Sequence, residues 1–554
     1  MAVKVITTEP GHSLAPEGPH TVTFHFPGWD AVIPFRLGDP KAFAKLRSIY
    51  PRFGPFFEVK QLADSILTAL SLSPQTHGCL PFTDPHAFSL AQSFALPPSN
   101  HRNPAHAPSP SELLLKVVDI AAIRLYVVAY PLPKTKGVLP IWQNPGIGIS
   151  TRLAASLLDA PIAVVPFSVP GDGDVSLDKL PPPTYLPEYD AHAALRERLV
   201  ELMNRAVPGG MTYPLVAERD VLLFPSGMAA IYHAFRAVQA WRPKGVVVVL
   251  GAVFHSTYHL LEKAEGGFKH FGDVGDGVVG AVEAYAEELK AEGREVAMVV
   301  VEFPSNPLLE CVDLVGLRAV ANKHSFPLVI DDTIGSFANV DLLPVSDIIV
   351  TSLSKSFSGY ANLLAGSLIL SPLSPFHAPL SQQLPFHNAL SSPDAVQLLT
   401  NSTSYLPRTA TLNRNAAALA ALFASHPLTC TPLYPPYLAS GKKNYARHLR
   451  LPTPELPEPG YGCLLSVNFG TVAQAKRFYE GVALHKGPHL GAHETIVFNY
   501  NEAVFGEWEE EREYHAGFGI VSEQVRVAVG LEEEGVLVET VRVALDEVLR
   551  AGDE

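Results

Sequence analysis

The stretch VIDDTIGSFANVDLLPVSDIIVTSLSKSFSGYANLLAGS, residues 329–367, decides the fold of this chain. Three short apolar runs rich in Val and Ile lie in or across it, PLVIDD (327–332), DIIVTS (347–352) and GSLILS (366–371). Continuous runs of this length are typical of strands that are buried on both faces of a sheet. Polar and charged residues stand at the ends of the first two runs, which is where α/β proteins bind their ligands.

The same pattern continues toward the N-terminus. VVVVLG (246–251) and AMVVVEF (297–303) are two more apolar runs, and helix-like stretches occupy 227–241, 278–293 and 314–324. Because strands and helices alternate, the sequence predicts an α/β domain around a largely parallel sheet.

Proline-rich or glycine-rich breaks at 99–112, 169–190 and 452–460 divide the chain. The last part mixes helices with strand-like runs at 462–470 and 524–531, which predicts a smaller α+β domain. We therefore expect an N-terminal extension of mixed character over 1–190, a large domain over 191–405 and a small domain over 406–554.

Composition narrows the class of protein. Of 554 residues, 47% are hydrophobic and 17% charged, and the net charge is −14, so neither nucleic acid nor an anionic membrane is an expected partner. The four cysteines are scattered without a CxxC pair, which argues against structural zinc or a disulfide framework, and we expect no metal. With no signal-peptide core and no apolar run of membrane-span length, we expect a soluble, cytoplasmic protein.

Lys355 lies in TSLSKSFSG (351–359), among four serines at the end of an apolar run. A lysine at a buried strand end is costly unless it is paired or used covalently. Burial favours the neutral amine, which is the nucleophile of Schiff-base chemistry, and the neighbouring serines could bind a phosphate. Taken alone, the motif is more typical of a solvated loop lysine.

Four other motifs contain residues that could bind a cofactor or a substrate next to this lysine. PSGMAAIY (225–232) places Ser-Gly before a helix-like stretch, where free amides bind anions, although an ordinary N-cap turn is equally compatible. Asp331 closes an apolar run and could protonate the nitrogen of a cofactor ring, whereas Asp332 suits an N-cap. Asn306 could donate to a ring oxygen or simply form a turn. Arg526 alternates with valines and could hold a carboxylate or face solvent.

Taken in order, these motifs resemble the Cys/Met-metabolism family of pyridoxal-phosphate (PLP) enzymes, the cystathionine γ-synthase group. The resemblance covers roughly 205–554 and is carried by SGM (226–228), EFPSNPLLECVDL (302–314), DDT (331–333), SLSK (352–355) and RVAVGLE (526–532). Residues 329–367 look most like the fungal branch, and PGWDAVIPF (27–35), YPRF (50–53) and WQNPGIGIS (142–150) resemble its N-terminal extension. The resemblance implies a fold-type I transferase, with a mostly parallel seven-stranded sheet in the large domain.

The resemblance also implies roles for individual residues. Lys355 matches the Schiff-base lysine, and Asp331 matches the partner of the pyridinium nitrogen. The remaining matches are Gly227, Met228, Ser352 and Ser354 for the phosphate, Arg152 for the phosphate of a neighbouring subunit, Asn306 and Phe254 for the ring, and Arg526 and His489 for the substrate.

Three positions depart from the family pattern. Phe254 stands where the family has a tyrosine over the ring, so any proton transfer by that phenol is lost. Tyr258, one helical turn later, is a candidate replacement. His489 stands where the family has a serine, and the YSR-type segment is not clearly present.

By resemblance, the expected reaction is γ-replacement on an O-acylated homoserine with cysteine, giving cystathionine for transsulfuration and methionine biosynthesis. Small-molecule amino acids are the expected substrates, and a homodimer or homotetramer with shared active sites is the expected assembly. One alternative is a specialised γ-replacement or γ-elimination enzyme of secondary metabolism that uses a carbon or other nucleophile. The other alternative is a non-catalytic regulatory protein with the PLP fold.

Overall fold

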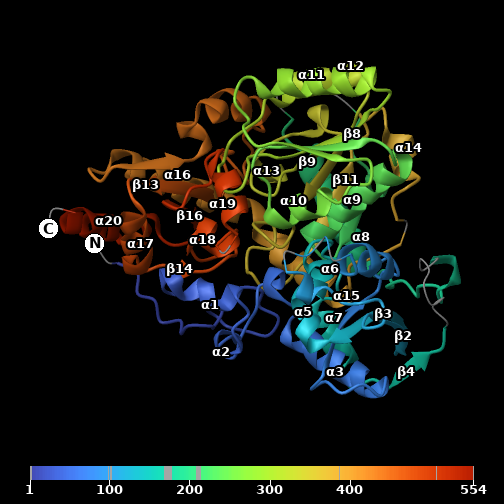
Figure 1. Cartoon of the computed structure of the whole chain (residues 1–554). Coiled ribbons are helices and arrows are strands. Elements are labelled where there is room, and N and C mark those ends of the chain that lie inside the picture. The colour runs from blue at the N-terminus through green and yellow to red at the C-terminus, as the bar shows by residue number, and fades with distance from the viewer. Residues whose placement is uncertain are drawn as a thin grey trace.

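The computed structural model describes residues 3–552, apart from Pro98, Asn100, Arg102, 168–176, 208–213, Phe386 and Glu507. Three β-sheets organise the chain (Figure 1). None of the described helices combines the length and the apolar character that a membrane span requires.

The central sheet has seven strands in the order β5-β11-β10-β9-β8-β6-β7. They are β5 (Val221–Phe224), β6 (Val246–Leu250), β7 (Phe268–Phe271), β8 (Val296–Glu302), β9 (Leu328–Asp331), β10 (Ile348–Thr351) and β11 (Gly366–Leu370). Four of the five runs expected as strands, β6, β8, β9 and β10, pair in parallel. The fifth, β11, runs antiparallel to both of its neighbours. The α/β fold-type I class is confirmed.

Helices cover this sheet. They are α8 (Asp190–Asn204), α9 (Gly227–Trp241), α10 (His255–Leu261), α11 (Val278–Ala291), α12 (Leu314–His324), α13 (Ser336–Asn339), α14 (His377–Ser381) and α15 (Ser392–Asn401). The helix-like patterns at 227–241, 278–293 and 314–324 correspond to α9, α11 and α12. Each pattern places apolar side chains against the sheet, and the two core clusters on either side of the strands consist largely of Val, Leu and Ile.

The C-terminal region is the expected α+β unit. Its five-stranded sheet, ordered β12-β13-β16-β15-β14, contains β12 (Cys430–Leu433), β13 (Leu464–Phe469), β14 (His485–Lys486), β15 (Ile496–Phe498) and β16 (Gln524–Ala528). Its helices are α16 (Tyr405–Ser425), α17 (Val472–Gly481), α18 (Tyr500–Val504), α19 (Glu509–Ala516) and α20 (Glu534–Gly552).

The N-terminal region builds an antiparallel sheet of its own, ordered β1-β3-β2-β4. Its strands are β1 (His77–Phe82), β2 (Leu114–Ile120), β3 (Ile123–Pro131) and β4 (Ile162–Val165). Its helices are α1 (Val32–Arg36), α2 (Pro40–Phe43), α3 (Phe57–Ala69), α4 (Ala87–Leu90), α5 (Thr135–Val138), α6 (Pro140–Gln143) and α7 (Thr151–Leu157). In Figure 1 this blue region lies below both other sheets.

Before it enters that sheet, the N-terminal segment packs along the other domains. The Val22 amide donates to Ala361 O at 2.7 Å, and the Phe26 amide donates to Lys486 O at 2.8 Å. Trp29 is buried in the C-terminal core cluster. The predicted linker at 169–190 lies partly outside the described residues, and from 177 it leads through a short turn to α8. The division at 190 and 405 remains our proposal, and it coincides with the starts of α8 and α16.

Candidate active site

Lys355 lies just after β10, in the wall of a cavity with an empty volume of about 1150 Å³ that includes space open to solvent. Its Nζ is 3.1 Å from the hydroxyl of Tyr50 and 3.5 Å from Nδ1 of His489. Nine of the residues singled out in the sequence line this cavity: Lys355, Gly227, Met228, Phe254, Asn306, Asp331, Ser352, Ser354 and Arg526. The fold therefore brings together motifs that are up to about 300 positions apart in the chain.

One end of the cavity is built to hold an anion. Gly227 and Met228 begin α9, whose first-turn amides have no acceptor within the helix, and Ser226 caps the helix by accepting from the Ala229 amide at 3.0 Å. A Cβ at Gly227 would lie 2.6 Å from Cβ of Ser352, so the position requires glycine. Ser354 also lines the cavity, but its Oγ donates to Ala365 O at 3.1 Å and accepts from its amide at 2.9 Å.

Two carboxylates line the cavity at the ends of neighbouring strands. Asp331 closes β9 and accepts from the Thr333 amide at 2.9 Å, and burial raises the pKa of its carboxyl. Glu302 closes β8, and burial together with the charge of Asp331 raises its pKa well above the usual range. Asp332 lies beneath the cavity, where it accepts from the Thr351 hydroxyl at 2.5 Å. Of the two neighbouring aspartates, Asp331 lines the cavity and Asp332 does not, so Asp331 is the one that could face a ligand.

Glu302 was not singled out by the sequence analysis, although it lies in the quoted EFPSNP motif. Its carboxylate accepts from the amide of Phe254 at 2.5 Å and from the amide of Asn306 at 3.2 Å. It thereby fixes the two residues that were expected to contact the ring of a cofactor. Phe254 lines the cavity as expected.

Tyr258 does not replace the missing tyrosine. The segment is helical, as that idea required, but the Tyr258 ring packs against Phe268 and His270 with centroids 5.2 and 5.3 Å apart. Phe254 lines the cavity and Tyr258 is not among the described residues that line it. The hydroxyl nearest Lys355 is that of Tyr50, in the quoted YPRF segment, which the sequence analysis gave no role.

Arg526 is suited to bind a carboxylate. It is 3% exposed, its guanidinium donates to Asn306 Oδ1 at 3.2 Å and to Pro488 O at 2.7 Å, and burial lowers its pKa. Its Nε is buried and has no hydrogen-bond partner within the described part of the chain. A buried guanidinium with an unused donor next to a cavity matches a ligand carboxylate.

His489 lies behind Lys355 and does not line the cavity as the described residues define it. It is fully buried, and burial followed by the charges of Lys355 and Arg526 lowers its pKa well below the usual range. The neutral imidazole lies 3.5 Å from the amine, so His489 is placed to orient Lys355. Its contact with a substrate stays a prediction.

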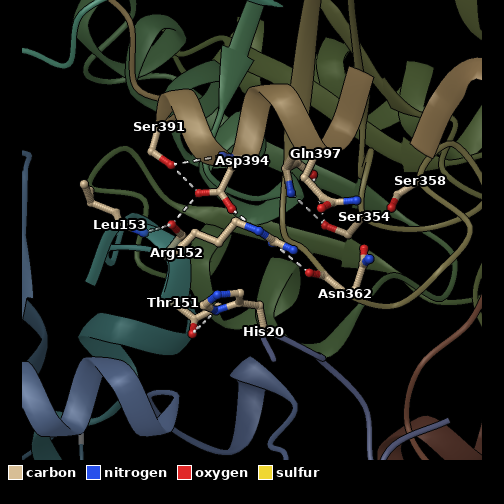
Figure 2. Close-up of polar contacts among 12 residues, drawn as sticks. His20, Thr151, Arg152, Leu153, Ser354, Ser358, Asn362, Ser391, Asp394 and Gln397 are labelled. Carbon is tan, nitrogen blue, oxygen red and sulfur yellow. Dashed lines mark hydrogen bonds and ion pairs between the residues drawn. The ribbon is translucent and has the colours of Figure 1, made fainter. Parts of the chain in front are cut away.

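Arg152 also lies outside the cavity wall. Its guanidinium donates to Asn362 O at 2.8 Å and lies 3.4 Å from Oδ1 of Asp394 (Figure 2). The Asp394 carboxylate in turn accepts from the hydroxyls of Ser150 and Ser391. Within one chain Arg152 therefore holds the loop after Lys355, and its role toward a neighbouring subunit stays a prediction.

The residues present fit PLP. The anion site at α9, the acidic pair at the strand ends and Lys355 match the phosphate, the ring nitrogen and the aldehyde of that cofactor. The unused donor of Arg526 suits the carboxylate of an amino acid.

Comparisons with known proteins agree with this assignment. Residues 212–546 match the family model described as Cys/Met metabolism PLP-dependent enzyme. A cystathionine gamma-synthase-like enzyme of Amanita muscaria is 28% identical, with 97% of this chain and 96% of the relative covered. An alanine racemase of Aspergillus violaceofuscus is 35% identical over 68% of this chain and 67% of its own length.

A solved structure shares the fold. Cystathionine gamma-synthase from Xanthomonas oryzae pv. oryzae, in complex with cystathionine, has a TM-score of 0.52 and 21% identity, over 66% of this chain and 99% of that one. At that identity the likeness shows the fold alone. Given the family model, the relatives and the site around Lys355, this chain belongs to the Cys/Met-metabolism family of PLP-dependent enzymes and is a cystathionine gamma-synthase-like enzyme.

Proposed function

We propose that the chain catalyses γ-replacement on an O-acylated homoserine with cysteine as the nucleophile, giving cystathionine. The observation that carries this proposal is the grouping of Tyr50 and His489 around Nζ of Lys355. γ-Replacement removes protons from Cα and then from Cβ, and it returns protons after the nucleophile has added at Cγ. A lysine held between a hydroxyl that can exchange protons and an imidazole that orients the amine suits such repeated transfer.

The residues of the chain divide the work. Arg526 would bind the α-carboxylate of the substrate and thereby orient Cα toward Lys355. Bound PLP supplies the electron sink that makes the Cα proton acidic. Lys355 would take that proton and exchange it through the hydroxyl of Tyr50 before the second deprotonation, while His489 would hold the amine in place. Loss of the Cβ proton expels the γ-acyloxy group as a carboxylate, and the thiol of cysteine adds at Cγ.

A second candidate function shares the two deprotonations and the loss of the γ-acyloxy group. It then either adds a carbon or other nucleophile in place of cysteine or ends in γ-elimination. Arg526 and Lys355 are the one arginine and the one lysine that line the cavity among the described residues, so this part of the wall holds no second arginine or lysine for the carboxylate of cysteine. Phe56, Trp142 and Ile149 form an apolar part of the wall, which suits a less polar partner. The Amanita relative, which bears a cystathionine gamma-synthase-like name, matches almost the whole chain.

The test is a product assay with paired donors and nucleophiles. With O-acetylhomoserine and cysteine, the proposal expects both acetate and cystathionine, and Lys355→Ala should release neither. Acetate without cystathionine would favour the second candidate. If the wild-type protein binds PLP but releases no acyl group from any O-acylated homoserine, both candidates are wrong.

We also propose that the protein is a homodimer or homotetramer acting in the cytoplasm. The family pattern supports a shared site, in which Arg152 would contact the phosphate of a neighbouring subunit. Sedimentation of the PLP-loaded protein measures its mass, and a monomer with full activity would contradict the shared site.

A further inference from the structure

A cluster of metal-ligand side chains lies between α10 and α19, outside the cofactor cavity. His255 and His259 are one turn apart on α10, and Glu511 faces them from α19. Nε2 of His255 is 3.0 Å from Nε2 of His259, and the two nitrogens are 3.0 and 3.2 Å from Oε1 of Glu511. Three potential ligand atoms thus form a small, nearly equilateral triangle.

A carboxylate orients the ring of His259 from its far side. Nδ1 of His259 is 2.9 Å from the carboxylate of Glu262, so a neutral ring carries its proton there and presents a lone pair at Nε2. A cation at the centre of the triangle could be bound by Nε2 of both histidines and by Oε1 of Glu511.

A fourth side chain points to the same conclusion. His515 is one turn after Glu511 on α19 and is 5% exposed. Both of its ring nitrogens are buried without a hydrogen-bond partner among the residues that the structure describes. Its Nε2 is 3.9 Å from Oε1 of Glu511. A buried, unsatisfied imidazole beside two other histidines and a carboxylate is a ready fourth ligand.

We propose that His255, His259 and Glu511 bind one Zn²⁺ ion, with His515 as the fourth ligand. Zinc prefers four nitrogen, sulfur or oxygen ligands in a tetrahedron, and Zn–N distances of about 2.0–2.1 Å place the ligand atoms about 3.3 Å from one another. The observed separations of 3.0 to 3.2 Å are close to that value. Glu262 supplies the carboxylate that orients a zinc-bound histidine from its far side.

The burial of the cluster gives the metal a structural role. Phe254 directly precedes α10 and lines the cofactor cavity, whereas α19 belongs to the C-terminal region. An ion shared by the two helices ties the residue that faces the cofactor ring to the C-terminal region. The scattered cysteines gave no sign of this site, because it uses only histidine and glutamate.

The test uses the full-length, PLP-loaded protein. Its metal content is measured by mass spectrometry before and after dialysis against a chelator, and Zn²⁺ is then returned in a calorimetric titration. We expect one Zn²⁺ per chain in the wild type and none in His259→Gln. Glu262→Gln should keep the site and weaken binding by about 10- to 100-fold.

A second cluster in the chain provides the matched control. Glu283, Glu287 and His324 also bring three ligand atoms together, but Nζ of Lys323 already binds both carboxylates at 2.6 and 3.0 Å. His324→Gln should therefore leave zinc binding unchanged.

Two results would overturn the proposal: no zinc binding by the stripped, folded wild type, or undiminished binding by His259→Gln. If His259→Gln does not fold, Co²⁺ replaces Zn²⁺ in the wild type, and the absence of a tetrahedral cobalt spectrum overturns the proposal instead. These readouts do not depend on turnover, so their failure leaves the proposed reaction untouched.

Discussion

Tyr50→Phe removes one hydroxyl from the active site and keeps the ring. Tyr50 is 7% exposed, and its ring packs 6.2 Å from that of Phe53 and 6.1 Å from that of His489. Phenylalanine fills the same space, so the fold and the cavity wall should persist. The substitution takes away the hydroxyl and, with it, the hydrogen bond of 3.1 Å to Nζ of Lys355.

The size of the effect depends on what that hydroxyl does. If it only positions the amine, a hydrogen bond to a charged group is worth about 1.5–3 kcal/mol, or about 10- to 150-fold in kcat. If it also carries protons for Lys355, general acid–base catalysis adds up to about 10²–10⁴-fold. We therefore expect kcat to fall by at least about 10-fold, with KM little changed, because the carboxylate contact proposed for Arg526 is left intact.

The assay is the steady-state release of the acyl group across a range of pH, with the absorbance of bound PLP measured on the same samples. A proton-transfer role predicts that one limb of the pH profile shifts or disappears, while the absorbance of PLP attached to Lys355 remains. Tyr434→Phe is the matched control, because that tyrosine is 1% exposed, lies outside the cavity wall and has a hydroxyl without a hydrogen-bond partner among the described residues. If kcat and the pH profile of Tyr50→Phe equal those of Tyr434→Phe, the role given to Tyr50 is wrong.

Three further changes test other parts of the site. Arg526→Lys keeps the charge but loses the planar fork, so kcat/KM for the amino acid should fall by about 10- to 150-fold in initial-rate measurements. Gly227→Ala pushes a Cβ to 2.6 Å from that of Ser352, and overpacking of about 1–3 kcal/mol should weaken PLP binding about 5- to 150-fold in a fluorescence titration. Burial and the charge of Asp273 raise the pKa of Glu310 from 4.5 to about 7, so this group makes the folded protein less stable as pH rises from about 4.5 to about 7. Glu310→Gln should therefore stabilise the protein by up to about 3 kcal/mol at pH 8 and by little at pH 4, as urea unfolding would measure.

The strand-end motifs of the site could be predicted because each is local. Asp331 and Lys355 follow apolar runs whose length and composition suit buried strands, and parallel strands bring such ends to one edge of a sheet. The direction of β11 could not be predicted, because a short continuous apolar run suits parallel and antiparallel pairing equally.

The N-terminal sheet escaped prediction for a different reason. β2 and β3 form a hairpin, and such turns are usually signalled by Asn-Gly or Asp-Gly. Here the turn is Ala121-Ala122, and Ala121 takes the left-handed φ of 51° without a glycine to announce it. Tyr50 and the cluster of His255 with Glu511 were missed because each contact joins residues more than 250 positions apart, and a single sequence carries no signal for such pairs.

The N-terminal region is part of the active site because its glycine-containing segment 146–148 contacts the start of α9 directly. The Ser226 hydroxyl, which caps α9, donates to Gly146 O at 2.7 Å, and a Cβ at Gly146 would lie 2.5 Å from that same hydroxyl oxygen. Two residues later, a Cβ at Gly148 would lie 2.2 Å from the Trp142 ring, so the segment has no room for larger residues on either side. Tyr50 from the same region reaches the other functional group, Nζ of Lys355. The contact at Gly146 supports the proposed phosphate site, and the contact of Tyr50 supports the amine of Lys355. Loss of the N-terminal region should therefore impair PLP binding and proton transfer together. If the region only covered the cavity, its loss would change only the access of the substrate.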